Sequence, residues 1–275
     1  MTDLLLRMYV FVVGASIGSF LNVCAGRWPA GLSVVSPRSR CPGCGHRISW
    51  FENIPLISWI ALRGRCRGCG QRISVQYPLA ELCVGLLWLA STVEFGFTFT
   101  ALRVAVFATI LLGVALTDAA HYVIPDGFTA SGLLFAIFAA IVGTFTNETL
   151  PFAGLYDALI GACVGAGAIA ITGWLGELAF KKEAMGFGDV TLMAMVGAHV
   201  GPTRALMTVF LAALIGAAVF LLVVYPIAWV RGRGSGEPTE MPLVPFGVFL
   251  APGALVALLW GNAIIAWYVE RVLGM

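Results

Sequence analysis

The chain has 275 residues, of which 60% are hydrophobic and only 11% are charged, whereas soluble domains carry roughly 25% charged residues. This composition excludes an ordinary soluble protein and predicts one that crosses a lipid bilayer several times. The net charge of +2 is too small to indicate a nucleic-acid partner. We expect the first apolar stretch to be a retained helix rather than a cleaved signal peptide.

Eight apolar stretches are near the length needed to cross a hydrocarbon layer of about 30 Å. The sixth is short, because Gly201-Pro202 is typical of a helix stop. A polar, glycine-rich connection at about 231–242 is expected to be a flexible loop. In chain order the stretches cover about 4–23, 79–94, 100–119, 127–146, 155–180, 189–201, 205–230 and 243–269. The fold class is therefore all-α, a polytopic membrane protein with about eight transmembrane helices.

One sizeable polar insertion separates the first two apolar stretches. It contains about 50 residues, which is below the size at which a hydrophobic core alone usually stabilises a fold. The chain thus divides into a first transmembrane helix (1–24), the insertion (25–78) and a seven-helix membrane domain (79–275). Close behind the insertion, Glu81 lies one turn into an apolar stretch and needs a partner, for which an arginine of the insertion is the simplest candidate.

Four cysteines give the insertion a means of stabilisation. Cys41-Pro-Gly-Cys44 and Cys66-Arg-Gly-Cys69 are separated by 21 residues, a spacing typical of two zinc knuckles that share one ion. Four thiolates leave no open coordination position, so the zinc site is expected to be structural. Two disulfides and a redox role are the alternatives, and a reducing cytoplasmic location disfavours the disulfides.

The distribution of basic residues predicts the orientation of the chain in the membrane. Eight of the sixteen Lys and Arg residues lie between Arg27 and Arg72. If this insertion is cytoplasmic, the loops that hold Lys181, Lys182, Arg231 and Arg233 are cytoplasmic too, and twelve of the sixteen basic residues are inside. Both termini are then expected on the outer face.

Two carboxylates fall at the same end of the apolar stretches in this topology. Asp118 closes the third stretch and Asp189, in the segment Met185-Gly186-Phe187-Gly188-Asp189, opens the sixth. Both ends face the cytoplasm. Charged groups within a membrane protein are costly and are functional candidates by default, although Asp189 at a helix start is also typical of an N-cap.

Nearby residues suggest roles around these carboxylates. Gly186 and Gly188 would let an extended substrate backbone approach closely. Asp126, in Pro125-Asp126-Gly127, is typical of a turn and helix cap, while His121 is a possible neighbour of Asp118 on the same helical face. Facing carboxylates can share a proton and activate water for peptide hydrolysis, but two helix caps on one face remain the alternative explanation.

The chain resembles the bacterial type IV prepilin peptidases, which are also N-methyltransferases of the type IV pilus and type II secretion systems. The resemblance covers nearly the whole chain. It includes Gly186-Phe187-Gly188-Asp189 and Asp118 with Ile124-Pro125-Asp126, together with the two cysteine pairs. The other matching segments are Gly18-Ser19-Phe20-Leu21-Asn22-Val23 with Arg27 and Pro29, Asn53-Ile54-Pro55-Leu56-Ile57-Ser58-Trp59, Arg63-Gly64-Arg65-Cys66 and Tyr77-Pro78-Leu79-Ala80-Glu81.

The resemblance implies an enzyme of the bacterial inner membrane. Asp118 and Asp189 match the family's catalytic aspartates, which cut a basic leader from prepilins or pseudopilins on the cytoplasmic side. The family then methylates the new N-terminal residue with S-adenosylmethionine, and its zinc-binding cytoplasmic region is implicated in that transfer. Thr191 and Val248 depart from residues common in the family, lysine and proline, without removing a carboxylate or a thiolate.

The sequence leaves some of these activities open. No glycine-rich nucleotide-binding element locates an S-adenosylmethionine site. The alternatives are a peptidase without transferase activity, or a non-catalytic membrane assembly protein whose zinc module docks partner subunits. The sequence does not indicate an oligomeric state.

Overall fold

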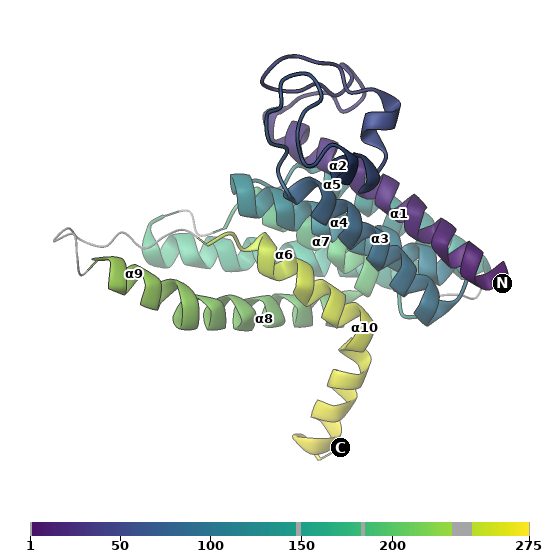
Figure 1. The fold of residues 1–275 in the computed structure, drawn as a ribbon. Coiled ribbons are helices and arrows are strands. Elements are labelled where there is room, and N and C mark those ends of the chain that lie inside the picture. Colours follow the sequence, from purple (N-terminus) through teal and green to yellow (C-terminus); the bar gives the residue numbers. More distant parts are fainter. Residues whose placement is uncertain (1, 147–149, 183–184, 233–243, 275) are drawn as a thin grey trace. The chain divides into compact units, whose positions relative to one another are not determined.

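A computed structural model of the chain describes residues 2–146, 150–182, 185–232 and 244–274, and within them the chain is built from helices (Figure 1). The long helices, in chain order, are α1 (Thr2–Arg27), α3 (Gln76–Phe95), α4 (Phe99–His121), α5 (Asp126–Thr146), α6 (Leu155–Phe180), α7 (Phe187–Val200), α8 (Pro202–Val219) and α10 (Gly247–Arg271). The chain also contains two short α-helices, α2 (Ile57–Ala61) and α9 (Tyr225–Gly232). Three further short segments are 3₁₀ or π helices: η1 (Trp28–Ala30), η2 (Trp50–Asn53) and η3 (Phe220–Val224). The described residues contain no strand, only two isolated β-bridges.

The all-α membrane fold is confirmed. Among the described residues, seven helical segments are long and apolar enough to cross a bilayer. The eighth apolar helix is α7, whose 14 residues span about 21 Å at 1.5 Å per residue. The sixth stretch is therefore short, as expected, and falls short of the bilayer thickness by itself. Most of the polar connection predicted at about 231–242 lies outside the described residues.

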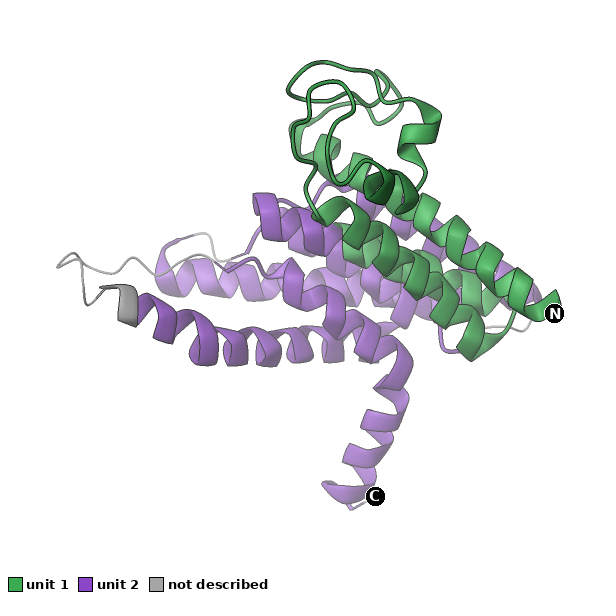
Figure 2. Ribbon diagram, in the orientation of Figure 1, with its two compact units in different colours: residues 1–113 green, residues 114–275 purple. Residues whose placement is uncertain are grey.

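Residues 1–113 and 114–275 form two compact units, and the boundary between them falls inside α4 (Figure 2). In the first unit α1 packs along α3. Gly18 allows this approach, because a Cβ there would lie only 2.7 Å from the Cα of Glu81. The small residues in the first apolar stretch therefore serve helix packing, as small residues do in membranes.

The polar insertion of the first unit has little regular structure. It contains η1, η2 and the short α2. Each cysteine pair lies in a turn: the amide of Gly45 donates to the carbonyl of Cys41, and the amide of Gly70 donates to that of Cys66, at 2.9 Å each. The isolated bridges Arg40–Arg47 and Arg65–Arg72 close the two turns in the same way. The insertion is thus two similar knuckles joined by short helices.

In the second unit α7 is the central helix. It packs against α5, α6, α8 and α10, and its residues from Leu192 to Val200 are almost all buried. The contact with α6 is between backbones: a Cβ on Gly161 would lie 2.2 Å from the carbonyl oxygen of Gly197. A helix enclosed by protein on all sides does not need to match the thickness of the bilayer, which explains why α7 can be short.

Candidate active site and metal centre

Asp118 is a buried carboxylate near the end of α4, with 6% of its surface exposed. Its Oδ2 accepts a hydrogen bond from the backbone amide of Val248 at 3.2 Å, next to Gly247. These two residues begin α10, so the carboxylate lies at the positive end of a helix dipole. Backbone amides at a helix start are suited to holding an anionic group in a fixed orientation.

Gly247 leaves no space for a side chain beside this carboxylate. A Cβ at position 247 would lie 2.7 Å from Oδ2 of Asp118 and 3.0 Å from Cδ1 of Ile124. Glycine therefore permits the backbone of α10 to approach Asp118. A role for the backbone at residues 247 and 248 was not predicted from the sequence. The feature that could have indicated it is a glycine at the start of an apolar stretch, directly after a proline-containing loop.

Asp189 lies in the first turn of α7, and it is not the helix cap. The N-cap is Gly186, so Asp189 is the third helical residue, and its backbone amide donates to the carbonyl of Gly186 at 3.1 Å. Gly188 faces Ile124, because a Cβ there would lie 2.9 Å from the Cβ of that residue. No side-chain hydrogen bond caps the start of α7, so the N-cap explanation for Asp189 is wrong.

Ile124 lies between the segments that carry the two carboxylates. It contacts the Gly188 turn on one side and the Gly247 turn beside Asp118 on the other. Two segments that are 71 positions apart in the sequence thus meet at the buried side chain of Ile124.

The other predicted neighbours are at the edge of this group. Gly186 is exposed at the N-cap of α7. Asp126 is exposed at the first position of α5, which agrees with a role at the helix start, and His121 is exposed at the end of α4. Their suggested roles beside Asp118 stay predictions.

The four cysteines of the insertion converge. Their sulfurs all lie within 4.8 Å of one another, with 3.8 Å between Cys41 and Cys69 and 3.9 Å between Cys44 and Cys66. Four sulfurs held tetrahedrally at about 2.3 Å from one zinc ion are about 3.8 Å apart. The sulfurs are too far apart for disulfides, so these residues fit a metal ion.

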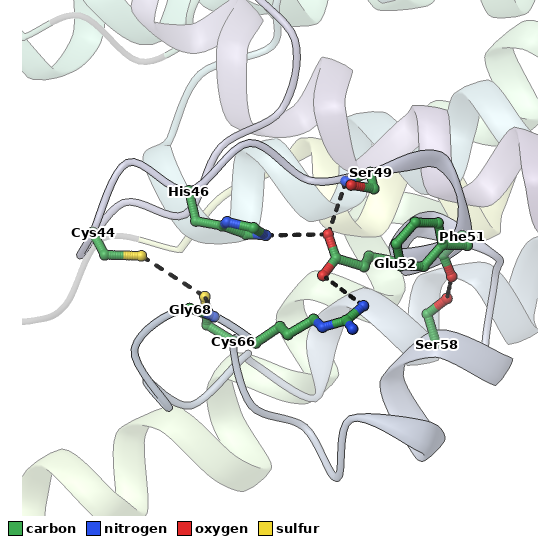
Figure 3. Close-up of polar contacts among 9 residues, drawn as sticks. Cys44, His46, Ser49, Phe51, Glu52, Ser58, Cys66 and Gly68 are labelled. Atoms are coloured by element: carbon green, nitrogen blue, oxygen red, sulfur yellow. Dashed lines mark hydrogen bonds and ion pairs between the residues drawn. The ribbon is translucent and has the colours of Figure 1, made fainter.

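Glu52 ties the first knuckle to the loop that follows it (Figure 3). Oε2 accepts the amide of Ser49 at 2.9 Å and lies 3.2 Å from His46 Nε2, while Oε1 lies 3.8 Å from Arg67. The amide of Ser49 first, and then the positive partners, lower the pKa of Glu52 below its ordinary value. His46 therefore contacts Glu52 and is not part of the sulfur cluster.

Comparison with known proteins places both sites in one family. Residues 12–95 match the bacterial peptidase A24 N-terminal domain, and residues 105–221 match the type IV leader peptidase family. A prepilin leader peptidase/N-methyltransferase of Myxococcus xanthus is 43% identical over 90% of this chain and 74% of that protein. The chain belongs to this family. It is therefore a membrane enzyme of the leader peptidase class.

Other relatives align over almost their whole length. The leader peptidase/N-methyltransferases of Stutzerimonas stutzeri and Pseudomonas aeruginosa are 37% and 35% identical, each over 94% of this chain and 92% of the relative. No solved structure matches the chain. The leader peptidase match contains both aspartates and the N-terminal match contains all four cysteines. The amides of residues 247 and 248 lie outside both matched segments.

Proposed function

We propose that this leader peptidase cuts the basic leader from prepilins or pseudopilins with Asp118 and Asp189, and then methylates the new N-terminus with S-adenosylmethionine. The observation that carries the peptidase proposal is the meeting at Ile124 of the two segments that hold the carboxylates, and both carboxylates lie in the part of the chain that matches the peptidase family. The names of the relatives support both activities.

The two carboxylates differ in their surroundings, which suits an acid and base pair. Asp118 is buried and is held by the amide of Val248 at the start of α10, whereas Asp189 is only partly buried. In the proposed hydrolysis, one ionised carboxylate takes a proton from a water molecule, whose oxygen attacks the scissile carbonyl carbon. The other carboxyl donates its proton to the carbonyl oxygen, and the amine leaves after protonation.

The surface beside Asp189 is suited to an extended peptide. Gly186 and Phe187 are exposed at the start of α7, with 74% of Phe187 accessible. The glycine presents backbone without a side chain, and the phenyl ring offers an apolar contact. We infer that the residues around the scissile bond lie along this turn on the cytoplasmic side of the inner membrane.

Methyl transfer is assigned to the insertion, residues 25–78, stabilised by structural zinc at Cys41, Cys44, Cys66 and Cys69. When bound, S-adenosylmethionine supplies a methyl group on a positively charged sulfur. The amine released by cleavage supplies the electron pair of the new C–N bond, the C–S electrons remain on sulfur, and the extra proton of the amine goes to water. This chain would need to bind the donor and position the amine beside it.

The dyad is tested with purified protein, a prepilin substrate and S-adenosylmethionine carrying a labelled methyl group. Asp118→Asn and Asp189→Asn should each lower cleavage by about 100-fold to 10,000-fold, because one proton-transfer group is lost. Asp126→Asn is the matched control and should retain most activity, since Asp126 is exposed at the start of α5. Cleavage by either dyad variant at the wild-type rate would contradict the assignment.

The same assay separates the alternatives. A shortened product that carries label supports both activities, and a shortened product without label indicates a peptidase alone. No shortened product from any prepilin, with a folded wild-type protein, would favour an assembly role.

A further inference from the structure

The first unit contains a cavity of about 520 Å³ that the peptidase proposal does not use. It lies between the polar insertion and the adjoining ends of α1 and α3, and neither Asp118 nor Asp189 lines it. Small-molecule sites in proteins typically enclose about 300–1,000 Å³. The cavity therefore has the size of a site for one small organic molecule.

Two buried acceptors lie on the helical wall of this cavity. Glu81 on α3 is 8% exposed, and its Oε2 accepts the amide of Leu56 at 2.8 Å. Asn22 on α1 is 9% exposed, and its amide nitrogen donates to the carbonyl of Tyr77 at 3.1 Å. Among the described residues, Oε1 of Glu81 and Oδ1 of Asn22 have no hydrogen-bond partner, and neither atom is fully buried, so both can contact the contents of the cavity. The expected pairing of Glu81 with an arginine is wrong, because its partner is a backbone amide.

A carboxylate oxygen that faces a cavity is available to accept hydrogen bonds from water or from a ligand. The bond to Leu56 fixes Glu81, and Leu56 itself has a left-handed backbone with φ of +63°. Glu81 is therefore held in position rather than free to turn towards solvent. An anion and a carbonyl oxygen on one wall are suited to a ligand with a positively charged group.

The insertion provides the opposite wall, which is aromatic and basic. The indole nitrogen of Trp59 donates to the carbonyl of Ile73 at 3.3 Å, which fixes the orientation of the ring. Three arginines, Arg40, Arg67 and Arg72, also line the cavity. A flat apolar surface suits a purine ring, and arginines suit a carboxylate.

We propose that this cavity binds S-adenosylmethionine, with Glu81 and Asn22 beside its positively charged sulfur and amino groups. The ligand combines an adenine ring, a sulfonium, an ammonium and a carboxylate, and the walls offer a complement to each. The proposal rests on the methyl donor of the proposed function and adds the residues that hold it. It also gives the zinc cluster a role, because Cys41 and Cys66 form part of the cavity wall.

Binding of tritiated S-adenosylmethionine to the full chain in detergent tests the proposal. Glu81→Gln should raise the Kd by about tenfold to a hundredfold, as expected for loss of a charge-assisted contact. Glu94→Gln is the matched control, because it makes the same change on the same helix at an exposed residue outside the cavity. Its Kd should equal that of the wild type, and an unchanged Kd in Glu81→Gln would overturn the proposal.

A measurement on the wild-type chain is independent of how the variant folds. Photo-crosslinking with an azido-adenosyl analogue of the donor should label peptides that contain Trp59 or Tyr77, in competition with unlabelled S-adenosylmethionine. Label confined to residues 114–275 would overturn the assignment of the cavity while leaving the transferase proposal intact. A wild-type chain that cleaves prepilin but binds no donor would instead contradict the transferase part of the proposed function, and this inference with it.

Discussion

Gly247 shows how one missing side chain determines the geometry of a carboxylate 129 positions earlier in the sequence. The amide of Val248 reaches Asp118 at 3.2 Å only because the backbone of α10 approaches without a Cβ in the way. The aspartate is thus oriented by backbone rather than by another side chain. Backbone donors are rigid, which suits a catalytic group that must keep one position.

Replacement of Gly247 by alanine should lower prepilin cleavage by about tenfold to a hundredfold, since a displacement of about 1 Å can cost that much. The new Cβ would lie 2.7 Å from Oδ2 of Asp118. Gly167→Ala is the control, because no atom lies within 4 Å of a Cβ there. Cleavage rates of both variants and the wild type are measured at saturating substrate. Wild-type activity in Gly247→Ala would contradict the proposed contact.

At the scale of helices, the central position of α7 depends on contact between backbones. Gly161 and Gly165 on α6 would each place a Cβ 2.2 Å from a carbonyl oxygen of α7. Such close packing replaces the hydrophobic driving force that helices lack in lipid. The helix that carries Asp189 is therefore positioned mainly through glycines on its neighbour.

Gly161→Ala should destabilise the protein by about 1–3 kcal/mol, the usual range for overpacking. The added Cβ must separate α6 from α7, whereas Gly167→Ala on the same helix meets open space. Thermal unfolding in detergent compares the two variants with the wild type. Equal unfolding temperatures for all three would show that α6 and α7 do not pack in this way.

We predict that the cysteine loop depends on a metal ion in place of a hydrophobic core. Purified wild-type protein should contain one zinc ion per chain, and Cys44→Ser should lose it and make the loop more sensitive to protease. Cys83→Ser is the matched control, because Cys83 is exposed on α3 outside the sulfur cluster. Elemental analysis by mass spectrometry measures the zinc. Absence of zinc in the wild type, with the four cysteines present as disulfides, would overturn the metal site.

At the scale of the whole molecule, the basic residues predict that the insertion is cytoplasmic and that both termini are periplasmic. Alkaline phosphatase folds only in an oxidising compartment. A fusion after residue 275 should therefore be active, and one after Lys182 inactive. The reverse pattern would invert the topology and place the aspartates on the wrong face for a cytoplasmic leader.

Composition and local pattern predicted much of this protein. Apolar length and polar breaks defined the helices, including the short one that carries Asp189, and the spacing of four cysteines predicted their convergence. Asp118 and Asp189 could be placed at one depth because helix direction alternates across a membrane. These properties depend on local sequence or on the number and direction of the membrane-spanning helices, so they can be predicted without knowing how the helices pack.

Only the tertiary structure decided which groups complete each site. The amide of Val248 reaches Asp118 from a distant segment, Ile124 lies between the segments that carry the two carboxylates, and Glu81 bonds a backbone amide instead of the arginine expected from its charge. No periodicity encodes such contacts. They depend on how closely particular backbones approach, and that approach is set by packing among helices that are far apart in the sequence.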